Sequence, residues 1–301
     1  MTRLVEDYLL VWVVLAVVIG TFVPAAAVVT RASTAILVVM VGSTSLLLSI
    51  DDLRAVNRRV LGGIVIAQLA MVGFAFGLAT LLGMSPAVTA GFVLLGAITP
   101  ELVSPTMTAL VEGDVALSSL ALVVIGGVSV GYAPASVTLF LGNAIHVDVW
   151  RIVEELIIAV VAPMAVAIAI RTRYEQAVAR YDDSYSTVAS LMVVLIIGGV
   201  AAANASLLHG SLDRLVLIGS AAFALNVVGY GLGWGAARLA GGTQSERLAG
   251  VFTVGMRDFA VAAALVVAAG FPTTAALPAI LFGVIEMTTS AGLVRLTTTR
   301  G

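Results

Sequence analysis

Long apolar runs with short polar breaks extend along almost the whole of this 301-residue chain. A helix that spans the hydrocarbon core of a bilayer needs about 20 mostly apolar residues, and runs of that length recur from one end to the other. Only 11% of the residues are charged, whereas 60% are hydrophobic. A soluble domain carries about 25% charged residues, so this chain cannot cover a water-facing surface of its size. We therefore predict an all-α integral membrane protein whose residues 1–301 form a single domain in the lipid bilayer.

The polar breaks divide the chain into ten predicted membrane spans. Turn-forming and charged residues gather in these breaks, for example at 51–59, 171–184 and 241–247. The first apolar run lacks a small-residue cleavage motif, so we interpret it as a span and not as a signal peptide. The ten spans are expected at about residues 8–29, 33–50, 60–82, 87–111, 115–141, 148–171, 186–205, 212–238, 248–270 and 274–296.

Arginine placement predicts the orientation of these spans. All fifteen basic residues are arginines: eleven lie in predicted breaks or at span ends on the side of the N-terminus, three lie on the opposite side, and Arg257 lies well inside a span. Cytoplasmic loops of membrane proteins collect Arg and Lys. We therefore expect a multi-pass protein of the plasma membrane with both termini in the cytoplasm.

Polar residues interrupt corresponding spans in the two halves of the chain. Gln68 and Asn226 are 158 positions apart (226 − 68), and Glu101 and Arg257 are 156 positions apart (257 − 101). A half with five spans forces the second half to insert upside down, which is the plan of many transporters with binding sites near the midplane. These offsets predict two inverted five-helix repeats.

Four ionisable residues lie where hydrocarbon is expected, namely Glu101, Arg257, Asp258 and Glu286. A charge at the centre of a spanning helix costs about 2.5–3.5 kcal/mol on insertion scales, and such residues persist where they face a partner or a water-filled cavity. Two interpretations stay open. One is a buried ion pair between Glu101 and Arg257 that fixes helix packing, and the other is a role for the charged residues in transport.

Two predicted spans contain a segment that disfavours a regular helix. Residues 99–105 hold two prolines with a glutamate between them, and each proline removes a backbone donor and clashes with the preceding turn. Residues 253–259 hold a flexible glycine ahead of an Arg-Asp pair. A simple proline kink is one interpretation. The alternative is a pair of crossed broken helices, whose free carbonyls hold a cation and whose helix N-termini hold an anion.

Several segments resemble the bile acid:sodium symporter family. Residues 113–118 read Gly-Asp-Val-Ala-Leu-Ser, which resembles the turn that follows one broken helix in that family. Residues 254–258 read Val-Gly-Met-Arg-Asp where the family has Val-Gly-Met-Gln-Asn, and Ala-Ala-Ala-Leu follows at 262–265. Gln68 and Asn226 also fit the family pattern. The resemblance extends over nearly the whole chain.

The resemblance implies a panel domain, a core domain and a cleft between them. The panel would comprise about residues 8–50 and 148–205, and the core about residues 60–141 and 212–296. Two core helices would cross at broken centres, with two sodium ions behind the crossing and a small organic anion in the cleft. We assign substrate or coupling roles to six polar residues, namely Glu101, Ser104, Asn226, Arg257, Asp258 and Glu286.

The sodium sites that the resemblance implies are only partly preserved. Pro105 falls at a ligand asparagine, Leu122 at a ligand threonine, and Thr253 at the acidic residue that both sites share. Arg257 falls at a ligand glutamine, where its repulsion of a cation about 4 Å away is about 4 kcal/mol at an effective dielectric near 20. We therefore expect the usual sodium coupling to be lost or remodelled. Arg257 would stand in for one sodium ion, balanced by Glu101, Asp258 or Glu286, and coupling would then run on protons or be absent. The residual sodium-site positions are Gln68, Ser104, Ser118, Thr253, Val254 and Met256.

Other functions are weaker alternatives. A cation/proton antiporter would also use crossed broken helices with buried carboxylates, and an efflux carrier could take arsenite or another small oxyanion. An enzyme is disfavoured because the chain has no cysteine and no evident nucleophile–base pair. His146 and His209 stand alone, so we expect no cofactor and no metal other than sodium. No Walker pattern indicates ATP binding, no nucleic-acid partner is expected, and the sequence leaves the oligomeric state open.

Overall fold

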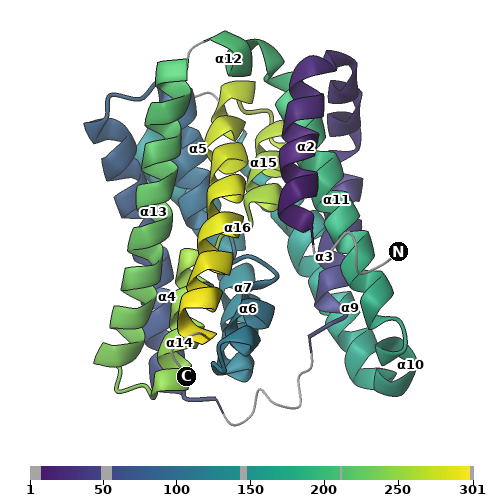
Figure 1. The fold of residues 1–301 in the computed structure, drawn as a ribbon, viewed down its shortest axis with the longest axis vertical. Helices are drawn as coiled ribbons and strands as arrows, with labels where there is room; N and C mark the ends of the chain where they lie inside the picture. The colour runs from purple at the N-terminus through teal and green to yellow at the C-terminus, as the bar shows by residue number, and fades with distance from the viewer. Residues whose placement is uncertain (1–7, 49–55, 143–147, 211, 299–301) are drawn as a thin grey trace.

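The computed structural model describes residues 8–48, 56–142, 148–210 and 212–298. Within these ranges every regular element is a helix, so the all-α prediction is confirmed (Figure 1). His146 lies outside the described residues, as does the side chain of His209. The elements are α2 (Leu9–Phe22), η1 (Pro24–Ala32), α3 (Ser33–Ser45), α4 (Arg58–Leu81), α5 (Pro86–Ala97), α6 (Ser104–Leu110), α7 (Val115–Leu141), α8 (Val149–Leu156), η4 (Ile157–Val161), α9 (Ala162–Arg173), α10 (Glu175–Ala179), α11 (Asp182–Ala203), α12 (Ala205–Gly210), α13 (Leu212–Leu239), α14 (Gln244–Gly255), α15 (Phe259–Ala268), η5 (Thr273–Ala276) and α16 (Leu277–Thr298).

Seven helical stretches of the described chain are long and apolar enough to cross a membrane. Three shorter apolar helices, α2, α5 and α15, accompany them. This pattern identifies a multi-pass helical membrane protein, since each long stretch satisfies its own backbone hydrogen bonds in hydrocarbon. The seven stretches are Pro24–Ser45, Arg58–Leu81, Val115–Leu141, Val149–Arg173, Asp182–Ala203, Leu212–Leu239 and Thr273–Thr297.

Two predicted spans have a different internal course from the one expected. The first apolar run was expected to continue to residue 29, but α2 ends at Phe22 because Pro24 lacks the backbone donor that the next turn needs. The 3-10 helix η1 then leads directly into α3. In the predicted span 148–171, a π-helical turn, η4, separates α8 from α9 just before Pro163.

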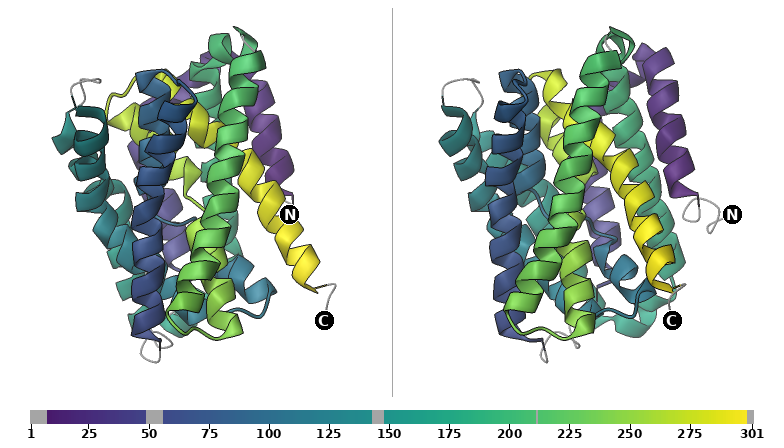
Figure 2. Two further views of the ribbon diagram at one scale, coloured as in Figure 1. Left: turned by 90° about the vertical axis from the view of Figure 1, so that its left-hand side faces the viewer. Right: turned by 60° about the vertical axis from the view of Figure 1, so that its left-hand side comes forward.

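The helices pack into two groups that face each other across the molecule. In one group α11 packs against α2, η1 and α3, and α3 packs against α9. In the other group α13 packs against α4, α14 and α16, and α5 packs against α4 and α7 (Figures 1 and 2). Contacts between the groups include α15 with α3 and α11, and α16 with α2.

The contact between α13 and α14 in the second group depends on glycines. A Cβ atom on Gly233 of α13 would lie 1.9 Å from the Gly250 carbonyl oxygen of α14, and one on Gly250 would lie 2.5 Å from the Gly233 carbonyl oxygen. Small residues of this kind let backbones approach closely in membranes, where helix association depends on van der Waals packing. The contact holds α14, and with it the segment that follows, directly against α13.

Candidate functional site

Two short non-helical segments meet in the interior of the molecule. One joins α5 to α6 (residues 98–103), and the other joins α14 to α15 (residues 256–258). They pair as a single antiparallel bridge between Pro100 and Arg257. The N–H of Glu101 donates to the Met256 carbonyl over 3.2 Å, and the N–H of Asp258 donates to the Thr99 carbonyl over 3.1 Å. Each segment thereby satisfies backbone groups that the other leaves open.

Two buried amides satisfy the carbonyls at the ends of the helices that lead into these segments. Gln68 of α4 donates from Nε2 to the Ile98 carbonyl over 3.0 Å. Asn226 of α13 donates from Nδ2 to the Gly255 carbonyl, also over 3.0 Å, and accepts from Thr289 Oγ1 over 2.7 Å. The structure therefore places both residues, which the sequence marked as site residues, against the backbone of the interruptions.

Arg257 is fully buried, and its guanidinium group lies among carbonyl oxygens. Nη1 donates to the Gly96 carbonyl over 2.6 Å, and Nη2 donates to the Val254 carbonyl over 3.2 Å. Within the described residues no ion pair of 4.0 Å or less joins Arg257 to Glu101, so the structure does not contain the ion pair that one of the two interpretations proposed. The physical reason is that the helix ends leave carbonyl oxygens free, and these occupy the guanidinium donors instead.

We call the place where residues 98–103 and 256–258 pair the crossing. The remaining charged residues of the crossing have separate roles. Asp258 caps α15 by accepting the N–H of Val261 at Oδ1 over 2.9 Å. Glu286 of α16 accepts the backbone N–H of Arg257 at Oε2 over 2.8 Å. Glu101 contributes its backbone N–H to the bridge, and its Oε2 atom has no hydrogen-bond partner in the structure. All three carboxyl groups are buried.

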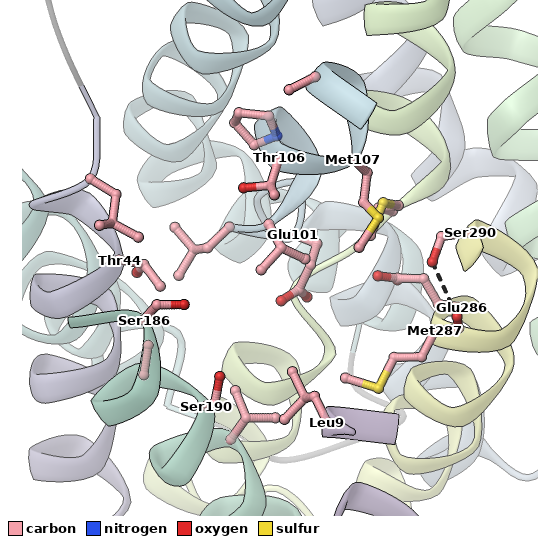
Figure 3. Close-up of a pocket in the computed structure, with 18 of the residues that line it drawn as sticks. Leu9, Thr44, Glu101, Thr106, Met107, Ser186, Ser190, Glu286, Met287 and Ser290 are labelled. Carbon is pink, nitrogen blue, oxygen red and sulfur yellow. Dashed lines mark hydrogen bonds between the residues drawn. The ribbon is translucent and has the colours of Figure 1, made fainter. Parts of the chain in front are cut away.

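A cavity of about 610 Å³ opens between the two helix groups and reaches the crossing. Its walls come from α2, α3 and α11 on one side and from α6, α7 and α16 on the other. Glu101 and Glu286 both belong to its lining, and Figure 3 shows Glu101 at the centre of this space. The sequence did not mark the hydroxyl groups of the lining, because single serines and threonines are common in apolar helices. These residues are Thr44, Thr106, Ser119, Ser186, Ser190 and Ser290.

Comparison with known proteins decides the family. The sequence model of the Sodium Bile acid symporter family matches residues 34–211. The chain belongs to this family. It is 26% identical over 278 residues to the "Uncharacterized sodium-dependent transporter YocS" of Bacillus subtilis (strain 168), which covers 91% of this chain and 85% of that protein. It is also 25% identical over 197 residues to the "Uncharacterized protein YbaS" of the same organism, covering 65% of this chain and 64% of that protein.

As a member of the sodium bile acid symporter family, the chain is a membrane transporter, and the earlier resemblance is confirmed. The residues predicted as residual sodium-site positions are buried close to the crossing. Several of them form hydrogen bonds with one another or with neighbouring residues. Ser118 Oγ and Thr253 Oγ1 lie 3.1 Å apart, within hydrogen-bonding distance. The Val254 carbonyl accepts from Arg257, and the Met256 carbonyl accepts from Glu101.

Two side-chain atoms at these positions have no hydrogen-bond partner among the described residues. They are Ser104 Oγ and Gln68 Oε1, both fully enclosed. No group of three or more His, Cys, Asp or Glu side chains that could hold a metal ion occurs in the described part of the chain. The oxygen atoms near the crossing therefore form no acidic multi-ligand site of the kind that binds divalent metals.

Proposed function

We propose that this chain is a secondary carrier of the plasma membrane that moves a small organic solute through the 610 Å³ cavity. The observation that carries the proposal is that the cavity lies between two separately packed helix groups and ends at buried charged residues. In this mechanism the panel (about 8–50 and 148–205) and the core (about 60–141 and 212–296) move against each other, so that the cavity opens alternately to either side. Both termini are cytoplasmic in this proposal, as the arginine distribution predicts.

The proposed architecture has ten membrane spans in two inverted repeats. The seven long stretches supply seven, α2 supplies another, and the pairs α5–α6 and α14–α15 supply one each. Corresponding contacts support the repeat. Asn226 follows Gln68 by 158 positions (226 − 68), and the carbonyls that they bind, Gly255 and Ile98, are 157 apart (255 − 98). The same spacing of 157 separates the bridge partners Arg257 and Pro100 (257 − 100).

In the proposed mechanism Arg257 occupies the place of a sodium ion. Its guanidinium group binds the Val254 carbonyl, one of the positions that the resemblance assigns to sodium coordination. The hydroxyls of Ser118 and Thr253, at two further such positions, bond to each other. A tethered cation balances buried carboxylates as sodium would, but it cannot leave during the transport cycle. The carrier is therefore expected to work without sodium, with protons as the alternative coupling ion.

The resemblance implies a small organic anion as the substrate. Uptake into proteoliposomes should be measured for a panel of organic acids and organic amines, with sodium and pH gradients imposed separately. We expect uptake that does not respond to a sodium gradient. Sodium-driven uptake that survives Arg257→Ala but is lost in Gln68→Ala would contradict the proposed role of Arg257. Sodium-driven proton efflux without any organic solute would instead indicate a cation/proton antiporter.

The tethered cation can also be tested without a substrate. Replacing choline chloride by sodium chloride should leave the melting temperature of the wild type unchanged. The double variant Thr253→Glu, Arg257→Gln restores the carboxylate and the amide that the resemblance places at the sodium sites. At a sodium concentration about ten times the Kd of this variant for sodium, its free energy of unfolding should rise by about 1.4 kcal/mol. Thr253→Gln with Arg257→Gln is the matched control, because it lacks the carboxylate; an equal sodium response in the wild type would refute the idea.

A further inference from the structure

The charged residues that line the 610 Å³ cavity are all acidic. Glu101 and Glu286 line it, whereas no Arg, Lys or His occurs among its described lining residues. The two residues line the same space, Glu101 from the segment before α6 and Glu286 from α16 (Figure 3). A solute that carries a negative group would thus meet two carboxyl groups and no basic side chain.

Each of these carboxyl groups has an oxygen atom without a hydrogen-bond partner among the described residues. The atoms are Glu101 Oε2 and Glu286 Oε1, on residues that are 6% and 0% exposed. A buried ionised carboxylate is stable only when it is paired or hydrogen-bonded, since its transfer from water is expensive. Both atoms are enclosed by the protein, and each needs a proton or a cation that no described residue supplies.

The protein itself does not supply that cation. The guanidinium group of Arg257 is directed at the carbonyls of Gly96 and Val254, and the contact of Arg257 with Glu286 is through its backbone N–H. With Glu101, Asp258 and Glu286 ionised and Arg257 protonated, the four groups carry a formal charge of −2 (1 − 3). An added anion would increase this imbalance, whereas an added cation would reduce it.

The size and the walls of the cavity indicate what kind of cation fits. A volume of about 610 Å³ is in the range of small-molecule pockets and far exceeds that of a bare ion. Away from the two glutamates the walls are mainly apolar, with Met40, Leu102 and Met287 among them, and hydroxyl groups are interspersed. Such walls suit an apolar body, and the carboxylates suit a positively charged head.

We propose that the cavity binds an organic cation, an ammonium head group on an apolar body, with the head group held between Glu101 and Glu286. The site rests on the proposed carrier function, because the cavity is the one through which the solute is to move. In this proposal the substrate is an organic cation and not the organic anion that the resemblance implies. Glu101 and Glu286 are then substrate-binding residues, and Arg257 lies behind them as a fixed charge.

Three probes with the same apolar body and different head groups test the charge preference. They are 4-phenylbutylammonium, the neutral 4-phenylbutanol and the anion 4-phenylbutyrate, each titrated by calorimetry into the full chain in lipid nanodiscs. The ammonium should bind at least about tenfold more tightly than either of the others, because hydrogen bonds to charged groups are among the strong ones. Glu101→Gln and Glu286→Gln keep the shape of the side chain and should each remove most of this preference.

Glu175→Gln is the matched control, since Glu175 is exposed on α10 and lies outside the cavity lining. This variant should keep the preference of the wild type. Equal or tighter binding of 4-phenylbutyrate, or an ammonium preference that survives in both cavity variants, overturns the proposal. The measurement is one of binding alone, so a failure of the carrier function in the uptake assay would be seen separately.

Discussion

Polar residues within apolar spans have two different uses in this protein, and Gln68 and Asn226 show the first of them. Each amide donates to the carbonyl at the end of an interrupted helix, Ile98 in one case and Gly255 in the other. In hydrocarbon an open carbonyl has no water to bind, so its free energy depends on a donor from a neighbouring helix. Glu101 and Glu286 show the second use, because each belongs to the cavity lining and has an enclosed oxygen atom without a hydrogen-bond partner among the described residues.

We predict that Asn226→Ala lowers the free energy of unfolding by about 1–2 kcal/mol, because the Gly255 carbonyl loses its side-chain donor. Thermal unfolding of the purified protein in detergent measures the loss. Asn204→Ala is the matched control. The Val200 carbonyl that the Asn204 amide binds also accepts the backbone N–H of Asn204, so the control should lose less. A larger loss in Asn204→Ala would contradict this explanation.

The positions of the buried charges could be predicted from the sequence, but their partners could not. A charged residue inside an apolar run can be recognised from the sequence alone, and Arg257 and Glu286 are indeed buried. One of the two interpretations of the sequence paired Arg257 with Glu101, whereas in the structure its guanidinium group binds the carbonyls of Gly96 and Val254. Backbone carbonyls are present at every residue, so a sequence does not show which of them a crossing leaves free.

At the scale of the helix, packing of α13 against α14 depends on which face its glycines occupy. Gly233 faces the Gly250 backbone, whereas a Cβ atom on Gly231 would meet nothing within 4 Å. Helix α13 has a glycine at every second position from 229 to 235. Gly229 and Gly233 lie on the face that packs closely against α14, whereas Gly231 and Gly235 lie on a face where a Cβ atom would meet nothing within 4 Å. The same helix carries Asn226, so this contact also sets the distance from its amide to the Gly255 carbonyl.

Gly233→Ala should destabilise the protein by at least about 1–3 kcal/mol, the usual cost of overpacking, because the backbones of α13 and α14 would have to separate. Gly231→Ala is its matched control in the same helix. It should be neutral or stabilise by up to about 1 kcal/mol, since alanine is the better helix former. Melting temperatures of the two variants, measured side by side, test the difference. Equal effects would show that the contact does not limit stability.

Helix positions were easier to predict than the irregularities inside them. The predicted span 115–141 coincides with α7, and 212–238 differs from α13 by one residue. Apolar run length and flanking turn residues define such helices. The end of α2 at Phe22 and the π turn of η4 were missed, because neither interrupts the apolar run.

On the scale of the whole molecule, the cavity extends from the crossing toward one end of the bundle. The end of α3, the beginning of α11 and the end of α16 all contribute to its lining. The same end carries most of the described arginines, among them Arg171 and Arg173 at the end of α9 and Arg238 at the end of α13. In the proposed topology these arginines are cytoplasmic, so the cavity extends toward the cell interior.

Single cysteines test this orientation directly, because the natural chain contains none. Ser186→Cys lies in the cavity lining, and Ser206→Cys lies in a second cavity near the beginning of α13. A membrane-impermeant maleimide should label Ser186→Cys from the cytoplasmic side and Ser206→Cys from the outside. Ser129→Cys, 1% exposed in α7, should stay unlabelled from both sides. The reverse pattern would show the opposite topology.

The bridge between the two interruptions also has a consequence for biosynthesis. Glu101 leaves the ribosome 155 residues before Met256, whose carbonyl accepts its N–H (256 − 101). At a translation rate of about 5–20 residues per second, the segment 98–103 is complete about 8–30 s before the segment that it pairs with. During that time its open peptide groups must be accommodated by the translocon, by water or by other chains. Nascent chains that stop before residue 256 are therefore expected to be early targets of membrane quality control.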